Sequence, residues 1–191
     1  MRERFFTGKI AFIGLLAILL AATSYAQQPR KESLLNGLKV LVFPDNGSDR
    51  VWARIRVHSG SAFDPQGHEG VMKMLSGNIF PNEAAKDYFT DDLGGSLEVR
   101  TTYDYIEIDA SAKPENLIPM LETLSGAIAA PVIDKDTTTR LREDLLAQLK
   151  QLERDPAYIA DRTAEARLFG TFPYGRPING TEGSLKKVDF A

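Results

Sequence analysis

Residues 70–80, GVMKMLSGNIF, carry the pattern from which the fold is inferred. Four apolar residues recur there at the spacing of an α-helix with one buried stripe, namely Val71, Met74, Leu75 and Ile79. We therefore expect a helix that packs this stripe on a core and leaves the opposite face directed outward.

The opposite face of this predicted helix carries an unusual set of side chains. Lys73, Ser76 and Gly77 stand at positions i, i+3 and i+4, so they share one face. The zinc motif H-x-x-E-H uses the same frame to present two histidine ligands and a catalytic glutamate. An amine, a hydroxyl and a glycine occupy those positions here.

The flanking sequence alternates between strand and helix patterns. Apolar residues at every second position predict strands at 38–42, 51–57, 96–101 and 105–112, the first two joined by the turn PDNGSD. Helical spacing predicts helices at 83–93, from 114 to before Pro131, and at about 158–168. A further helix, capped by Asp134 or Asp136, is predicted to run until Asp155 and Pro156. This order predicts an α+β fold, an antiparallel or mixed sheet with helices packed on one face.

Composition narrows the possible functions. The chain has 191 residues, a net charge of -3, no cysteine and two histidines, His58 and His68. Disulfides, thiolate metal sites and cysteine nucleophiles are therefore excluded. No basic patch indicates a nucleic-acid partner.

The N-terminal residues predict export. Arg2, Arg4 and Lys9 precede an apolar run at 10–22, and small residues lead up to Ala26. This is the pattern of a signal peptide, and the run is shorter than the roughly 20 residues that span a bilayer. We expect residues 1–26 to be cleaved and the mature chain, 27–191, to be periplasmic or secreted without a membrane anchor.

An ordered series of motifs resembles the first domain of the pitrilysin/insulinase family of zinc peptidases, family M16. The series is LLNGLKV, HSGSAFDPQGHEGVMKMLSG, GGSLEVRTTYD, TRLREDLLAQLKQLERDP and FPYGRPINGTE. It runs from about residue 35 to the end of the sequence. The resemblance implies a LuxS/MPP-like metallohydrolase half-domain.

The resemblance also identifies what differs from the family pattern. The first zinc-ligand histidine corresponds to Lys73, the catalytic glutamate to Ser76 and the second ligand histidine to Gly77. The third ligand falls near Gln148, and Glu98 stands where the family has an asparagine beside the substrate. A catalytic zinc needs about three protein ligands, so we expect neither zinc nor family hydrolysis here.

The resemblance further implies a role through a partner. Family members enclose peptides between two half-shells, of which only one needs zinc. We therefore expect a non-catalytic subunit that pairs with an active M16 homologue, with Arg54, Arg56, Lys73 and Glu98 in contact with peptide or partner. A peptide-binding module without turnover and a weak peptidase with a different site remain alternatives. The family continues beyond the pattern found here, so we expect either a fragment of a longer protein or a shortened paralogue.

Two other kinds of active site, a shifted metal site and a Ser–Lys dyad, compete with this interpretation. His68 and Glu69 begin an H-E-x-x-H pattern, but Met72 occupies the second histidine position. Lys73 and Ser76 lie one helical turn apart, the spacing of a Ser–Lys dyad, although no oxyanion hole is evident.

Overall fold

The computed structural model describes residues 29–189, which divide at Ser48 and Asp49 into two compact units. The predicted signal peptide lies outside the described residues. Among residues 29–189, the helices are too short or too polar to cross a membrane.

The first unit contains a β-hairpin. Strands β1 (Arg30–Ser33) and β2 (Lys39–Val42) pair antiparallel, with Ser33 opposite Lys39. Gly37 has a φ of 86°, and the Asn36 side chain accepts the Leu38 N–H at 3.1 Å, so the turn is closed locally. The strand expected at 38–42 is confirmed as β2. Its partner β1 was not predicted, because the sequence of β1 is polar.

The second unit is built on a three-stranded antiparallel sheet in the order β3–β5–β4. These strands span Val51–Val57 (β3), Ser96–Thr101 (β4) and Ile106–Ala112 (β5). The central strand alternates as predicted, with Ile106, Ile108 and Ala110 almost fully buried. One face of the sheet therefore forms the floor of the core.

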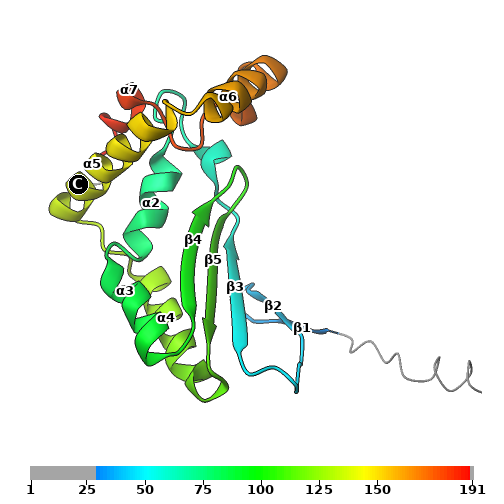
Figure 1. Cartoon of the computed structure of the whole chain (residues 1–191). Helices are drawn as coiled ribbons and strands as arrows, with labels where there is room; N and C mark the ends of the chain where they lie inside the picture. The colour runs from blue at the N-terminus through cyan, green and yellow to red at the C-terminus, as the bar shows by residue number, and fades with distance from the viewer. Residues whose placement is uncertain (1–28, 190–191) are drawn as a thin grey trace, which may run out of the picture. The chain divides into compact units, whose positions relative to one another are not determined.

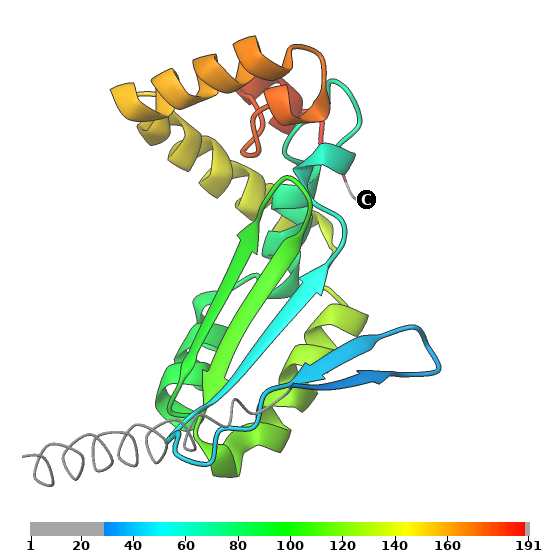
Figure 2. The same cartoon turned by 90° about the vertical axis from the view of Figure 1, so that its right-hand side faces the viewer.

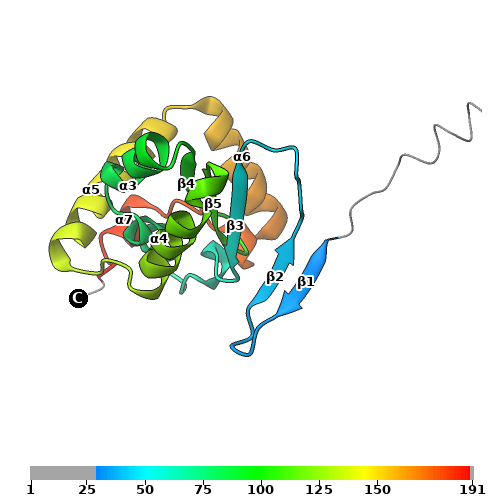
Figure 3. The ribbon, with the colours of Figure 1, turned by 90° about the horizontal axis from the view of Figure 1, so that it is seen from below.

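Helices pack on that face, as Figures 1 and 3 show, and Figure 2 shows the face that they leave open. They are α2 (Val71–Ile79), α3 (Glu83–Asp87), which continues as a π-helical turn (Tyr88–Asp92), and α4 (Leu117–Ala129). Phe89, Leu93, Met120 and Leu124 are buried against the sheet. The predicted α+β architecture with helices on one face is confirmed.

The C-terminal part adds a second helical layer beside α2. It consists of α5 (Lys135–Leu152), α6 (Pro156–Phe169) and the short α7 (Glu182–Leu185). Leu145 and Leu149 of α5 pack with Met74 of α2 and Leu185 of α7 in a second core. The segment after residue 170 is rich in turn residues, and at its end Thr181 and Ser184 form a capping box that starts α7.

Candidate functional site

The first turn of α2 is fixed by a buried carboxylate. Asp64 is 3% exposed and accepts the N–H groups of Gly70 at 2.7 Å and Met72 at 2.8 Å. Burial raises the pKa of Asp64, although its two N–H donors act in the opposite direction. This residue satisfies amides that the helix itself leaves unpaired, and the sequence analysis did not identify it.

The start of α2 is also held by the C-terminal segment. Ser184 donates its hydroxyl proton to the Glu69 carbonyl at 2.7 Å. A Cβ on Gly70 would meet the Leu185 side chain and lie 3.1 Å from the Gly180 Cα, and Gly70 has a φ of 96°. Glycine is therefore required at this junction, both for backbone conformation and for close packing.

A cavity of about 430 Å³ lies between α2, β4 and α5. Lys73, Ser76, Gly77 and Gln148 all line it, so the structure brings together the four positions that the resemblance led us to expect at the family's zinc-site residues. Arg140 and Asp144 line it too. Arg140, Asp144 and Gln148 follow one another at intervals of four residues, so they lie on one face of α5.

Lys73 is half-buried at this cavity. Within residues 29–189, no Asp or Glu oxygen lies within ion-pair distance of its ammonium. Burial lowers the pKa of Lys73, because the low-dielectric surroundings disfavour its charged form. The cavity thus contains a cationic group that has no anionic partner in the described part of the chain.

Ser76 does not face outward as expected. It is 4% exposed, and its hydroxyl donates to the Lys73 carbonyl at 2.8 Å and lies 2.8 Å from the Thr101 hydroxyl. The prediction of an outward face was wrong because α5 and β4 cover it. These contacts hold Ser76 on the Lys73 backbone, so they provide no Ser–Lys dyad.

The cavity residues do not fit a zinc ion. Zinc in proteins is bound by Cys, His, Asp or Glu, whereas the corresponding positions carry an ammonium, a hydroxyl, a glycine and an amide. Across residues 29–189, no three His, Cys, Asp or Glu side chains are grouped to hold a metal. His58 lies against the rings of Phe63 and Tyr105.

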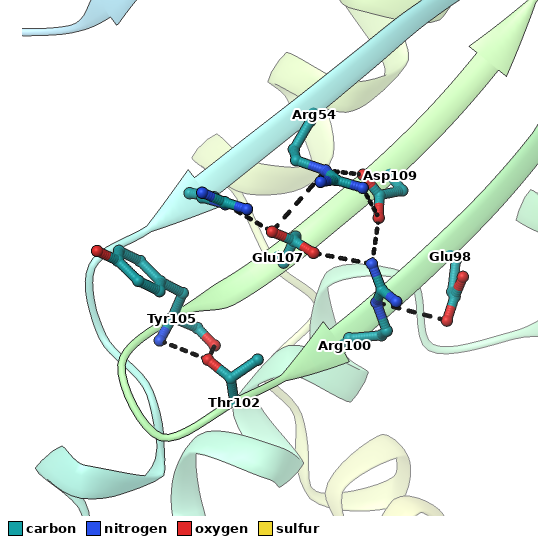
Figure 4. Close-up of polar contacts among 8 residues, drawn as sticks. Arg54, Glu98, Arg100, Thr102, Tyr105, Glu107 and Asp109 are labelled. Atoms are coloured by element: carbon teal, nitrogen blue, oxygen red, sulfur yellow. Dashed lines mark hydrogen bonds and ion pairs between the residues drawn. The ribbon is translucent and has the colours of Figure 1, made fainter.

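The open face of the sheet carries a charge network, shown in Figure 4. Arg54 contacts Asp109 at 2.5 Å, and Arg56 contacts Glu107 at 2.6 Å. Arg100 bridges both carboxylates, at 2.8 Å from Glu107 and 2.6 Å from Asp109. We call these five residues the arginine network.

The ion pairs of the arginine network lower the pKa values of its two carboxylates. The hydrogen bond from Arg56 lowers the pKa of Glu107, and the hydrogen bond from Arg54 lowers that of Asp109. Asp109 has two arginine partners and Glu107 has three, so the charges on this face are largely satisfied internally.

Three of the predicted contact residues lie on this open face and not at the cavity. Glu98 is placed opposite Asp109 in the β4–β5 register and lies 3.6 Å from Arg100. Its strand neighbours Leu97 and Val99 line the cavity instead, because successive side chains of a strand point to opposite faces. Contact of Arg54, Arg56 and Glu98 with a peptide or partner stays a prediction.

Comparison with known proteins assigns the family. The model of the insulinase family, peptidase family M16, matches residues 39–182. The chain belongs to peptidase family M16. Coenzyme PQQ synthesis protein F of Pseudomonas aeruginosa is 29% identical to this M16 chain over 162 residues, which are 80% of the chain and 20% of that protein. An insulin-degrading enzyme-like protein of Arabidopsis thaliana is 26% identical over 117 residues, 58% of the chain and 12% of that protein. The M16 chain thus spans a fifth or less of these relatives.

Solved M16 structures share the fold. The inactive domain of a peptidase M16 from Pseudomonas fluorescens superposes with a TM-score of 0.78 at 19% identity, over 86% of this chain and 41% of that one. Pitrilysin superposes with a TM-score of 0.75 at 20% identity, over 85% of this chain and 18% of its own. The expectation of an M16 half-domain is confirmed.

Proposed function

We propose that this chain is an exported, non-catalytic M16 subunit that binds peptides and helps a zinc-bearing M16 partner to degrade them. The observation that carries the proposal is the cavity itself. Lys73, Ser76, Gly77 and Gln148 all line this cavity, and these four side chains supply neither a zinc ligand set nor a base.

The strand beside the cavity supports peptide binding. In the described sheet β4 pairs only with β5, so its other edge leaves backbone N–H and C=O groups without sheet partners. Such an edge can take up an extended peptide as an added strand. Leu97 and Val99 would then place the side chains of that peptide over the cavity.

Two further observations support the remaining parts of the proposal. The Pseudomonas fluorescens neighbour is named an inactive M16 domain, so this fold occurs in a protein described as inactive. Export is supported by the basic, apolar and small-residue pattern of residues 1–26.

The test combines co-purification with a peptide assay. The tagged mature chain is isolated from its native source under non-denaturing conditions, and bound proteins are identified by mass spectrometry. We expect an M16 homologue with an intact H-x-x-E-H helix, and peptide hydrolysis by the pair that exceeds hydrolysis by the homologue alone.

Other outcomes select the alternatives. Peptide binding without any hydrolysis, even with the homologue present, would identify a binding module that acts alone. Turnover by the pure chain would identify a peptidase with a different site and would overturn the proposal.

A further inference from the structure

The charged side chains around the cavity are unequally paired. Among them, Lys86 lies 3.0 Å from Glu83, and Arg140 donates to the Pro81 carbonyl at 2.6 Å. Lys73 has no such partner in residues 29–189, and Asp144, the other carboxylate lining the cavity, lies beyond ion-pair distance of any described cation. Lys73 is therefore the one cation of the cavity lining whose ammonium has no polar partner among residues 29–189.

The surroundings make this charge receptive to an anion. An ammonium that is partly removed from water loses hydration that only a hydrogen-bonded anion replaces well. A carboxylate bound to Lys73 would make a charge-assisted hydrogen bond of the strong kind. Burial lowers the pKa of Lys73 in the chain without ligand, and an anionic partner would shift it back.

The size and position of the cavity indicate the carrier of the carboxylate. At about 430 Å³ the cavity is in the range of small-molecule pockets, roughly 300–1,000 Å³. Leu97 and Val99 form its wall on β4, the strand with the open edge. A peptide lying along that edge would place a terminal or side-chain carboxylate within the cavity.

We propose that the Lys73 cavity is a carboxylate subsite, which holds a peptide by its C-terminal carboxylate or by an aspartate or glutamate side chain. A fixed ammonium thus supplies a positive charge at a place where the family's frame would hold a metal. This proposal rests on the proposed peptide-binding function and specifies its ligand.

The experiment uses three fluorescein-labelled hexapeptide mixtures and the mature chain. The first has free C-termini and no acidic residues, the second is the same mixture as C-terminal amides, and the third is an amide mixture that includes Asp and Glu. Affinities are measured by fluorescence anisotropy at low salt. We expect the first mixture to bind about tenfold more tightly than the second, the scale of one charged hydrogen bond. Recovery of that gain by the third mixture would assign the site to acidic side chains as well, and its absence would assign it to the C-terminus.

Variants distinguish binding at the Lys73 cavity from nonspecific attraction of peptides by positive charge elsewhere on the chain. Lys73→Met is expected to abolish the preference for carboxylates, and Lys73→Arg to preserve most of it. The matched control Lys135→Met removes the same charge from an exposed position that does not line the cavity, so the preference should remain. Asp144→Asn removes a competing carboxylate from the lining and should tighten binding of the first mixture.

Failure of the two proposals can be told apart. Equal binding of all three mixtures, or a carboxylate preference that survives Lys73→Met, would overturn the subsite and leave peptide binding intact. Absence of binding by every mixture would overturn both.

Discussion

Positively charged side chains are paired with carboxylates on one face of the sheet, whereas Lys73 on the other face lacks such a partner in the described part of the chain. On the open face, Arg54, Arg56 and Arg100 share two carboxylates of the central strand. On the helix-covered side, Lys73 lines a cavity without an anion within ion-pair distance among residues 29–189. A paired network needs nothing from outside, whereas an unpaired, half-buried ammonium gains from a ligand. This difference is the reason why we propose the cavity, and not the more heavily charged face, as the place of recognition.

The largest expected effect comes from restoring the metal ligands to the cavity. The variant Lys73→His, Gly77→His, Gln148→Glu should bind Zn²⁺ about 100-fold or more tightly than the unmodified chain, because three converging ligands are what a zinc site requires. Equilibrium dialysis with metal analysis measures this affinity. Such a gain in affinity would show that the backbone positions of a zinc site are present beside the cavity and that only the ligand side chains are missing.

A matched control tests the alignment of Gln148. Gln151→Glu, combined with the same two histidines, adds the carboxylate to α5 at an exposed position outside the cavity lining. Equal zinc affinity of the two variants would show that Gln148 is not the equivalent of the third ligand.

The second effect concerns the anchoring of α2 beside the cavity. Asp64→Ala leaves the N–H groups of Gly70 and Met72 without their acceptor, so we expect a loss of about 3 kcal/mol in the free energy of unfolding. Urea titration followed by circular dichroism measures it. Arg54→Ala on the open face should cost clearly less, because that arginine is half-exposed. Similar losses of unfolding free energy for both variants would contradict the view that the buried contacts of α2 contribute more to stability than the ion pairs of the open face.

The third effect is the pH dependence of the open face. Pairing holds the pKa of Glu107 and Asp109 below their ordinary values of 4.5 and 3.8. The unfolded chain therefore binds more protons in this range, and the stabilisation is present above the ordinary values and lost as pH falls toward the folded-state values. Denaturant titrations across that window should show a steeper fall for the unmodified chain than for Glu107→Gln, Asp109→Asn. Asp64, with its raised pKa, contributes the opposite slope to both proteins and cancels. Parallel curves would show that the arginine network adds no stability.

The smallest effect is expected at Gly77. A Cβ there would lie 3.4 Å from the Leu141 side chain, an ordinary contact, and alanine is the better helix former by up to about 1 kcal/mol. Gly77→Ala should therefore raise the melting temperature slightly. Gly95→Ala is the contrasting variant, because its Cβ would overlap the Ser111 carbonyl and should destabilise. A lower melting temperature for Gly77→Ala would show that the cavity wall cannot accept a methyl group.

Local patterns predicted most of the fold. The alternation in β5 and the helical spacing in α2 and α5 predicted these elements, although residues of the opposite faces, such as Glu107 of β5 and Ser76 of α2, are buried too. The β1 strand was missed because its sequence, RKES, is polar and exposed. Ser76 was placed outward because helical periodicity gives the angle between faces and not what covers each face. The cover, α5, follows in sequence by more than 50 residues.

The candidate site was predictable only in part. The spacing of Lys73, Ser76 and Gly77 placed them on one face, and the motif order placed Gln148 near them. Asp64 and Thr101 were not identified, since their partners are set by tertiary packing. Arg54, Arg56 and Glu98 were expected at a contact surface by analogy with the family, but strand alternation turns them to the face of the sheet opposite the cavity.

The most direct measurement of the central claim is to incubate the purified mature chain with Zn²⁺ and the free-carboxylate hexapeptide mixture, and to analyse the products by mass spectrometry. The account predicts that peptides are retained intact on the chain, that retention is lost in Lys73→Met, and that no fragments form. Fragments whose formation depends on the chain and is suppressed by a chelator would contradict it, because they would show that the cavity or another part of the chain still performs metal-dependent hydrolysis.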